Sequence, residues 1–345
     1  MMTDSFKNKR ILFLSVQTFN YEKAIAEKLK SLGAKVDYYD ERPANSIFVK
    51  GIIRFKRSLY QKKINSYYKE ILKKTIGTNY DSLFVIKGEV VPSFFLEEFK
   101  NRNPKCVFIF YTWDSFSNNP NAVSILKYFD RKFTFDSNDA LFFNVDFRPL
   151  FFIDDYAGIN KISNGIINYN LLFLGTAHSD RYKIGNALVN WCDEQNLRSY
   201  AYYYMPSRLV YMFKTLFDSS FKSFEYKKLS FRSLSINEIV ALYNESAVIL
   251  DINHPGQNGL TMRTFEALGS GKKIITTNTE IKKYPFYNEN NVFVIDRENI
   301  VLQKTFFDSP FIQLDSVLYE NMSITGWLKA IFFETKPNYW IEGLK

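Results

Sequence analysis

The chain has 345 residues, of which 46% are hydrophobic and 23% are charged, and its formal net charge is +9. A chain this apolar can bury enough surface to offset the entropy lost on folding, so the composition excludes intrinsic disorder. With two cysteines and two histidines in all, the sequence excludes a disulfide framework and argues against a Cys/His zinc site. The length predicts about two domains.

The first half of the sequence shows alternating strand and helix patterns. Short apolar runs rich in β-branched residues predict strands at 11–16, 35–40, 82–88, 105–113, 132–137 and 147–153. Helical periodicity predicts helices at 21–33, within 47–75, from Pro92 to Lys100 and at 121–129. Strand, helix, strand at this spacing is typical of βαβ units and a parallel sheet.

The small, polar segment 157–165 predicts a linker, after which the same pattern begins again. Predicted strands follow at 169–175, 199–205, 247–253, 273–277 and 291–296, and predicted helices at 180–195, 235–246, 261–271 and in part of 314–333. We therefore expect an α/β protein with one domain at 1–160 and a second at 166–315. The remaining segment, 316–345, is expected to be helical and to pack back on the first domain.

The two halves differ in charge. Residues 1–165 contain 26 basic and 18 acidic residues, a net charge of +8, whereas residues 166–345 contain 19 and 18, a net charge of +1. Such an asymmetry predicts that the halves meet different partners.

No run of about 18 apolar residues, the length of a membrane-spanning helix, is present. The sequence also begins without the long apolar region of a signal peptide. We expect a cytoplasmic protein, peripheral at the inner membrane face where a surface element tethers it.

A glycine-containing loop at 254–261 leads directly into the predicted helix 261–271. Free backbone N–H groups and the positive end of the helix dipole favour an anion such as a phosphate there. Arg263 can add a charge-assisted contact, and Glu266 can accept hydrogen bonds from ribose hydroxyls. The alternative is an ordinary turn between a strand and a helix, with Glu266 in solvent.

The segment GLTMRTFEALGSGKKIITT (259–277) resembles the donor-binding motif of GT-B glycosyltransferases, and most of all the CgeB-like branch of lipopolysaccharide and capsule biosynthesis. The resemblance implies two Rossmann-like domains that face each other across a cleft. It implies that Glu266 binds ribose and that the amides of Gly259, Leu260 and Thr261 bind phosphate. Many relatives carry a second glutamate eight positions before the first, where this chain has Asn258, which can bond sugar hydroxyls without supplying charge.

A second loop of the same half, within LFLGTAHSDRYK (172–183), also faces the nucleotide diphosphate in GT-B enzymes. The resemblance therefore adds Gly175, Thr176 and Arg181 to the donor site, and His178 as a group that can bond a phosphate or the sugar. The alternatives are a solvated loop histidine and an arginine that pairs with a carboxylate at the start of a helix.

The first half has no histidine, so a general base there must be a carboxylate. Glu89 and Asp114 follow predicted strands directly and are expected at the carboxyl edge of the sheet, where open α/β sheets bind ligands. Each could instead be a helix N-cap.

The stretch 48–74 holds nine basic residues and one acidic residue, interleaved with apolar and aromatic side chains. A basic amphipathic helix is typical of a membrane surface or of an anionic glycolipid site. The expected cations are Arg54, Lys56, Arg57, Lys62 and Lys63. The alternative is a solvated face over a core-packing helix. Nucleic acid is not expected as a partner, because no nucleic-acid-binding motif accompanies the charge.

The sequence and the resemblance together predict a glycosyltransferase that moves a sugar from a nucleotide-sugar to a glycan or lipid-linked acceptor in bacterial surface polysaccharide synthesis. No cofactor and no metal are expected. Two alternatives stay open: a non-catalytic nucleotide- or glycan-binding protein, and a nucleotide-sugar epimerase of the same fold.

Overall fold

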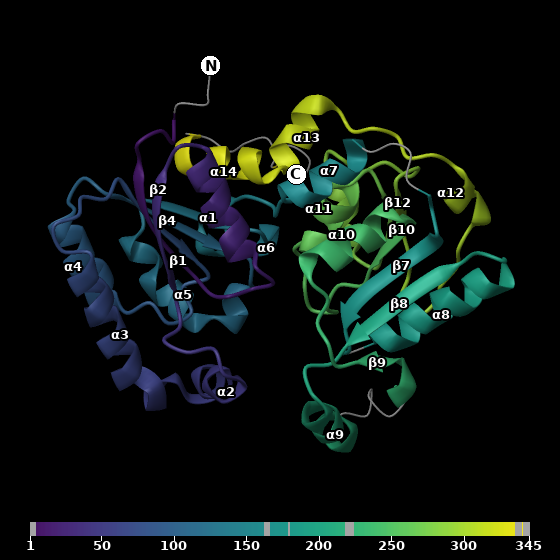
Figure 1. Cartoon of the computed structure of the whole chain (residues 1–345), viewed down its shortest axis with the longest axis horizontal. Coiled ribbons are helices and arrows are strands. Elements are labelled where there is room, and N and C mark those ends of the chain that lie inside the picture. The colour runs from purple at the N-terminus through teal and green to yellow at the C-terminus, as the bar shows by residue number, and fades with distance from the viewer. Residues whose placement is uncertain (1–4, 162–165, 179, 218–223, 335–339, 341–345) are drawn as a thin grey trace. The chain divides into compact units, whose positions relative to one another are not determined.

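The computed structural model describes residues 5–161, 166–178, 180–217, 224–334 and 340 (Figure 1). The chain divides into two compact units. Unit 1 holds the described residues up to Pro149 together with those from Ile324 onward, and unit 2 holds the described residues of Leu150–Ser323.

Unit 1 is built on a six-stranded parallel sheet in the order β2-β1-β3-β4-β5-β6. Its strands are β1 (Arg10–Ser15), β2 (Lys35–Asp40), β3 (Ser82–Ile86), β4 (Val107–Thr112), β5 (Arg131–Thr134) and β6 (Asp146–Phe147). The central strands are buried almost throughout because helices cover both faces of a parallel sheet.

The helices of unit 1 are α1 (Tyr21–Ser31), α2 (Ile47–Lys56), α3 (Gln61–Lys74), α4 (Ser93–Arg102), α5 (Pro120–Ile125), α6 (Ser137–Phe143) and α14 (Ile324–Phe333). The last of these returns from the end of the chain to the sheet. Trp327 of α14 is fully buried, and its ring lies 4.8 Å from that of Tyr111 on β4 and 6.0 Å from that of Phe84 on β3. This indole therefore fixes the C-terminal helix to unit 1.

Unit 2 repeats the architecture with a parallel sheet in the order β12-β11-β10-β7-β8-β9. Its strands are β7 (Tyr169–Thr176), β8 (Ser199–Tyr204), β9 (Leu229–Ser230), β10 (Ser246–Asp251), β11 (Lys273–Thr276) and β12 (Val292–Val294). Its helices are α7 (Asp154–Lys161), α8 (Arg181–Glu194), α9 (Arg208–Phe217), α10 (Ile236–Asn244), α11 (Met262–Gly269), α12 (Lys304–Asp308) and α13 (Ser316–Met322).

Local sequence signals explain several boundaries. The Ser235 hydroxyl accepts from the Glu238 amide and the Glu238 side chain accepts from the Ser235 amide, so a capping box forms at the start of α10. After α1, Gly33 adopts φ +98°, a left-handed conformation that glycine accepts without strain. The predicted α/β class with parallel sheets is confirmed in both units.

Three differences from the sequence predictions concern where one unit ends and the other begins. The predicted strand 147–153 is reduced to Phe147 in β6, although Phe152 forms an isolated parallel bridge with Ser323. Much of the predicted linker at 157–165 belongs to α7, whose Tyr156 and Ile159 are buried, and 162–165 lie outside the described residues. The boundary between the units instead falls between Pro149 and Leu150, and α13 belongs to unit 2.

The linker was predicted from the polar composition of 157–165. That composition also suits a helix, because a helix with one buried side needs only a few apolar residues. The described helices include none that is long and apolar enough to cross a bilayer.

Replacing Trp327 with alanine should remove the anchor of α14. The loss of a buried indole, with its cavity, should lower the free energy of unfolding of unit 1 by about 3–5 kcal/mol. The matched control is Leu141→Ala at an 84% exposed position of the same unit, which should change it by less than about 0.5 kcal/mol. Denaturant unfolding measures both values, and equal values for the two variants would contradict this role.

Candidate functional site

Arg181 lies at the carboxyl edge of the unit 2 sheet, where it is the first residue of α8. Its Nε donates to the carbonyl oxygen of Ile252, just beyond β10, over 2.9 Å. Burial and, after it, the positive charge of Arg263 lower the pKa of Arg181 to about 10. The two predicted donor-binding arginines therefore lie close enough to repel each other.

Arg263 lies in the first turn of α11 and interacts with the hydroxyl group of Tyr243. Burial opposes its charge, but Tyr243 and Asp251 raise its pKa above the ordinary arginine value. Its buried Nε has no hydrogen-bond partner among the residues that the structure describes. A buried donor of this kind gains free energy when a ligand supplies an acceptor.

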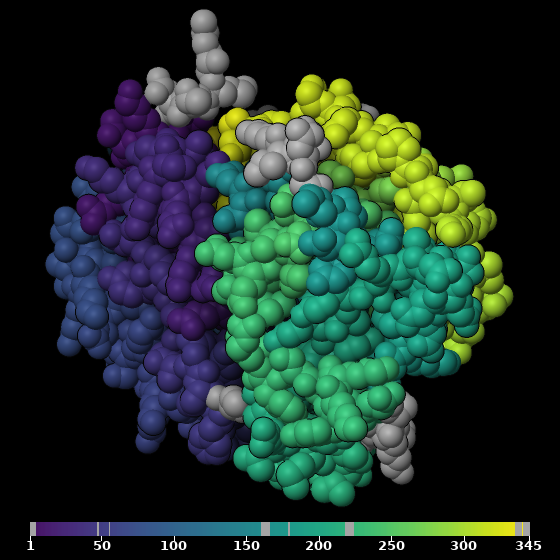
Figure 2. Space-filling view, turned by 45° about the vertical axis from the view of Figure 1, so that its right-hand side comes forward, coloured from purple at the N-terminus to yellow at the C-terminus, as the bar shows by residue number. Residues whose placement is uncertain are grey.

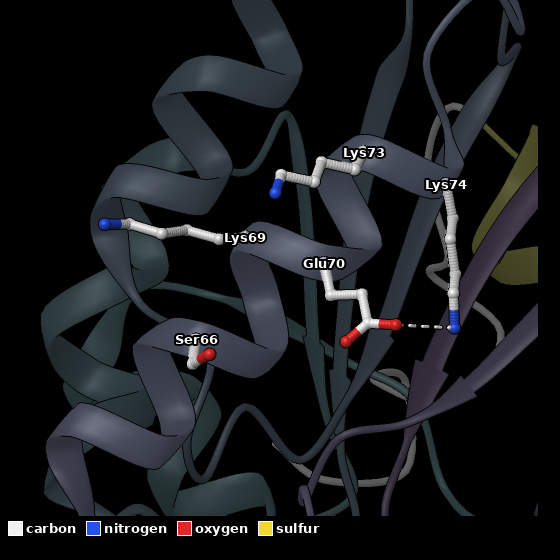
Figure 3. A pocket seen from close by; sticks show the side chains of 5 residues that line it. All are labelled: Ser66, Lys69, Glu70, Lys73 and Lys74. Carbon is white, nitrogen blue, oxygen red and sulfur yellow. Dashed lines mark ion pairs between the residues drawn. The ribbon is translucent and has the colours of Figure 1, made fainter.

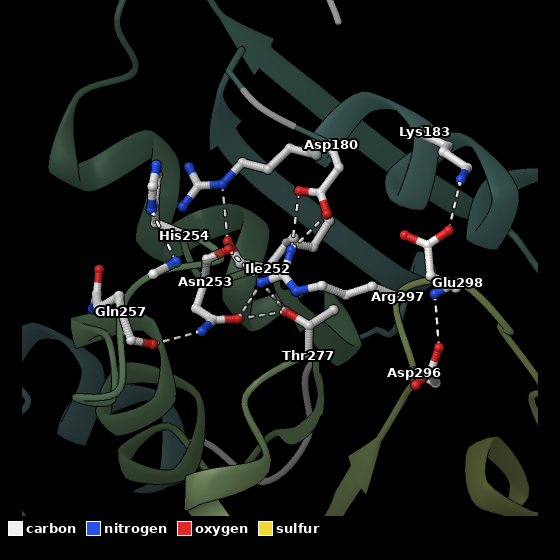
Figure 4. Close-up of polar contacts among 12 residues, drawn as sticks. Asp180, Lys183, Ile252, Asn253, His254, Gln257, Thr277, Asp296, Arg297 and Glu298 are labelled. Carbon is white, nitrogen blue, oxygen red and sulfur yellow. Dashed lines mark hydrogen bonds and ion pairs between the residues drawn. The ribbon is translucent and has the colours of Figure 1, made fainter.

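A third arginine, Arg297, follows β12 and holds the loops at this edge together (Figure 4). Its Nη1 lies 3.0 and 2.7 Å from the two carboxylate oxygens of Asp180. Its Nη2 donates to the backbone oxygen of Asn253 over 2.7 Å and to the Thr277 hydroxyl over 3.1 Å. Arg297 thus links the loops that follow β7, β10, β11 and β12. Its positive charge is paired with the carboxylate of Asp180.

The start of α11 is arranged to receive an anion. Thr261 is the N-cap residue, but its hydroxyl donates to Asp251 over 2.7 Å and makes no cap hydrogen bond. Thr264 donates to the same carboxylate oxygen over 3.1 Å. Asp251 therefore holds the helix start in place while no side chain caps its first-turn N–H groups, which favours an anionic group there.

The loop before α11 is folded by its own polar groups. The side chain of Asn253 donates to the Gln257 carbonyl, and the Gln257 side chain donates to the Gly259 carbonyl, each over 2.9 Å. Asn258 is exposed, and its carbonyl accepts from Asn278 over 3.0 Å. Leu260 is buried in unit 2, so it anchors the loop while the exposed Asn258 side chain can meet a ligand.

The two histidines of the chain come together beside these loops, with ring centroids 6.0 Å apart. His178 is half-buried. Burial, followed by the nearby charges of Arg181, Lys214 and His254, lowers its pKa to about 4. His178 is therefore neutral at neutral pH, so it can donate one hydrogen bond and accept another. His254 is exposed, and its Nδ1 accepts from the Gly256 amide.

Two further residues predicted for the donor site, Gly175 and Thr176, lie at the end of β7 rather than in the loop after it. Gly175 lies within β7, where an added Cβ would stand 2.5 Å from the ring of Phe173, so packing alone requires glycine there. Thr176 is the last residue of β7 and is half-buried.

Glu266 lies in α11, 6% exposed, and its Oε2 accepts from the Tyr243 hydroxyl over 3.1 Å. Burial raises the pKa of this carboxyl group to about 8, so it is mostly protonated at neutral pH. A ribose hydroxyl can reach it only through the small part of its surface that is exposed.

At the corresponding edge of unit 1, the two candidate bases share one lysine. Lys87 Nζ lies 3.5 Å from Glu89 Oε1 and 3.2 Å from Asp114 Oδ2. Arg42 Nε approaches the other oxygen of Glu89 to 2.5 Å. Although burial favours the neutral acid, Arg42 and Lys87 hold the pKa of Glu89 below its ordinary value, so Glu89 is ionised at neutral pH.

Glu41, which the sequence did not single out, positions this loop. Its buried carboxyl group accepts from the amides of Gly88 over 3.1 Å and Val90 over 2.7 Å, on both sides of Glu89. Lys87 takes a left-handed conformation with φ +85°, which a lysine adopts at an energetic cost. The loop that carries Glu89 is therefore fixed rather than free to rotate.

The basic stretch of unit 1 forms α2, a short 3-10 turn and α3. The apolar side of α3 enters the core through Ile64, Tyr68, Ile71 and Leu72. Its outer side carries Ser66, Lys69, Glu70, Lys73 and Lys74, which line a shallow pocket (Figure 3).

Of the cations named from the sequence, Arg54, Lys56, Lys62 and Lys63 are exposed. Arg57 is half-buried, and its Nη1 donates to Asn121. Arg57 therefore points into unit 1.

Known proteins were compared with this chain by sequence and by fold. No protein-family model matches it, and no curated protein matches it either. An α-glucosyltransferase in complex with UDP and mismatched DNA is 12% identical, with 98% of both chains covered and a TM-score of 0.57. A glycosyltransferase from Rickettsia africae is 14% identical, with 96% of this chain and 95% of that chain covered and a TM-score of 0.51.

A UDP-GlcNAc 2-epimerase from Neisseria meningitidis bound to UDP-GlcNAc has a TM-score of 0.50 at 10% identity, over 93% of this chain and 98% of that chain. At such identities the similarity shows the fold. The two units have the α/β two-domain fold of GT-B glycosyltransferases, as the resemblance predicted. The CgeB-like branch stays a prediction.

The raised pKa of Glu266 predicts a pH dependence of stability. Between the ordinary value of 4.5 and about 8, the folded state binds a proton that the unfolded state has lost, so this group's stabilisation falls as pH rises through that interval. Glu266→Gln should retain the fold and flatten this decline in melting temperature. The exposed Glu194→Gln is the matched control and should keep the wild-type slope. An unchanged slope in Glu266→Gln would refute the assignment.

The two arginines predict the behaviour of a diphosphate ligand. Arg181→Ala and Arg263→Ala should each weaken UDP binding by about 2 kcal/mol, or about 30-fold, since each removes a charge-assisted contact. Titration calorimetry measures the affinity. Lys304→Ala, an exposed cation of the same unit, should bind UDP as the wild type does, and wild-type affinity in both arginine variants would rule out the site.

Proposed function

We propose that the protein is a metal-independent glycosyltransferase that moves a sugar from a nucleotide-sugar to a glycan or lipid-linked acceptor. The observation that carries the proposal is the pair Arg181 and Arg263 at the carboxyl edge of the unit 2 sheet. Their mutual repulsion favours an anion with several acceptor oxygens, as a diphosphate has.

Arg181, Arg263 and the uncapped start of α11 would stabilise the charge that develops on the nucleoside diphosphate as it leaves. Preorganised donors of this kind act most strongly in a site that excludes water. They would serve in place of a divalent cation. Gly259, Leu260 and Thr261 would bind phosphate, while Thr176, His178 and Asn258 would lie near the phosphates or the sugar and Glu266 near the ribose.

Unit 1 would bind the acceptor. Glu89 is the first candidate base, because it is ionised and Glu41 fixes its loop. A base accepts a proton from the acceptor hydroxyl only while it is ionised. Asp114, on the other side of Lys87, is the second candidate.

The exposed cations Arg54, Lys56, Lys62 and Lys63 would face an anionic acceptor or membrane surface. This agrees with the +8 charge of residues 1–165 and with electrostatic attraction to anionic headgroups. The finer assignment, bacterial surface polysaccharide synthesis at the inner membrane face, follows from the CgeB-like resemblance.

A nucleotide-sugar epimerase is the second candidate. The observations that favour it are the similarity in fold to the Neisseria meningitidis epimerase and the paired rings of His178 and His254 beside the donor loops. An epimerase needs groups that move protons at the sugar. It would release an altered nucleotide-sugar and no free nucleotide.

Incubation with a panel of UDP-, GDP-, CMP- and dTDP-sugars distinguishes the candidates. A transferase should release free nucleotide faster in the presence of its acceptor. An epimerase should convert the sugar of the nucleotide-sugar without releasing free nucleotide. Epimer formed without nucleotide release would refute glycosyl transfer.

Glu89→Gln tests the base separately. It should lower kcat by about 100-fold or more, because general-base catalysis contributes that much, with little change in nucleotide affinity. Glu97→Gln, an exposed carboxylate of unit 1, should retain wild-type kcat. If Glu89→Gln and Asp114→Asn both keep full activity, neither carboxylate is the base.

A further inference from the structure

Helix α9 (Arg208–Phe217) presents its apolar side to solvent. Of its ten residues, none is fully buried, and five large apolar side chains are between 60% and 83% exposed: Leu209, Met212, Phe213, Leu216 and Phe217. The teal-green part of the chain that contains α9 lies at the surface of unit 2 (Figure 2). A helix on a protein core has the opposite arrangement, with its apolar stripe turned inward.

The spacing of these five residues makes one continuous surface. They recur at intervals of three and four, which places them on one side of the helix. The inner side is held by Val210 and Tyr211, which pack against the core of unit 2, while Lys214 and Thr215 are half-buried. The orientation of α9 is therefore fixed by contacts, and its apolar side cannot turn inward without breaking them.

The surroundings of this surface are basic and aromatic. The described residues 208–217 and 224–232 contain five Lys or Arg and one Glu, and α9 itself contains no acidic residue. Arg208 is exposed and lies over the ring of Phe231. Tyr226 is 47% exposed and stacks edge-on against Tyr211, with ring centroids 5.3 Å apart. Tyrosines and cations around an apolar helix face are typical of the membrane interface.

We propose that α9 docks unit 2 on an anionic lipid surface, with its five apolar side chains in the headgroup and acyl boundary and the neighbouring cations on lipid phosphates. The basic surroundings favour a lipid bilayer over a second copy of this chain, whose own net charge is positive. Interfacial helices combine apolar burial with electrostatic attraction in this way.

The position of α9 gives this docking a consequence. Lys214 is close enough to His178 for its charge to act on that ring, so α9 borders the donor loops of unit 2. Docking would place those loops at the membrane surface, where a lipid-linked acceptor resides. The inference goes beyond the proposed function, because binding to vesicles does not require nucleotide binding or sugar transfer.

Co-sedimentation with vesicles tests the inference. The full-length protein should bind vesicles of phosphatidylcholine mixed with phosphatidylglycerol, and bind phosphatidylcholine alone more weakly. Phe213→Ser combined with Leu216→Ser should abolish most of the binding, while UDP affinity stays at the wild-type value. Retained UDP affinity also shows that the variant folds, so a failure of docking is distinguished from a failure of the donor site.

The matched control replaces two exposed valines of unit 2 outside α9, Val301→Ser with Val317→Ser, and should bind vesicles as the wild type does. Three results would overturn the inference. One is no binding of the wild type to anionic vesicles, and another is equal binding by the α9 variant. The third is a wild-type dimer in light scattering that the α9 variant converts to a monomer, because α9 would then be covered by a second copy.

Discussion

Excess positive charge at the carboxyl edge of the unit 2 sheet is the constraint on which the proposed activity depends. Arg181, Arg263 and Arg297 meet there, beside two carboxylates, Asp180 and Asp251. Arg297 forms an ion pair with Asp180, and Asp251 accepts hydrogen bonds from two threonine hydroxyls at the start of α11. Within the described structure, three arginines therefore face two carboxylates. An anionic ligand would relieve the repulsion between the arginines, which burial strengthens.

Under the proposed function, the two units use the same architecture for different parts of the transfer. In each unit the parallel strands bring their following loops to one edge, where ligands bind in open α/β sheets. Unit 2 places arginines and a helix start at its edge, which suits phosphates. Unit 1 places Glu89 and Asp114 around Lys87 at its own edge, which suits a hydroxyl group and a proton.

Sequence patterns predicted most strands because buried parallel strands are short, apolar and separated by helical periods. The GT-B resemblance led to Arg181, and the position of Arg263 just after the glycine-containing loop 254–261 led to that second arginine. Sequence patterns could not predict Arg297, because its partners Asp180, Asn253 and Thr277 come from three distant loops that only the folded sheet brings together. Glu41 was missed for the same reason, since the amides that donate to its carboxyl group lie 47 and 49 positions away.

The central claim is that the unit 2 edge binds a diphosphate rather than a nucleoside. Calorimetric titration of the full-length protein with UDP and with uridine tests it most directly. We predict a much higher affinity for UDP than for uridine, with the difference decreasing as salt concentration rises, because the added affinity comes from charge. Equal affinities for the two ligands, or no binding of any nucleoside diphosphate, would contradict the account.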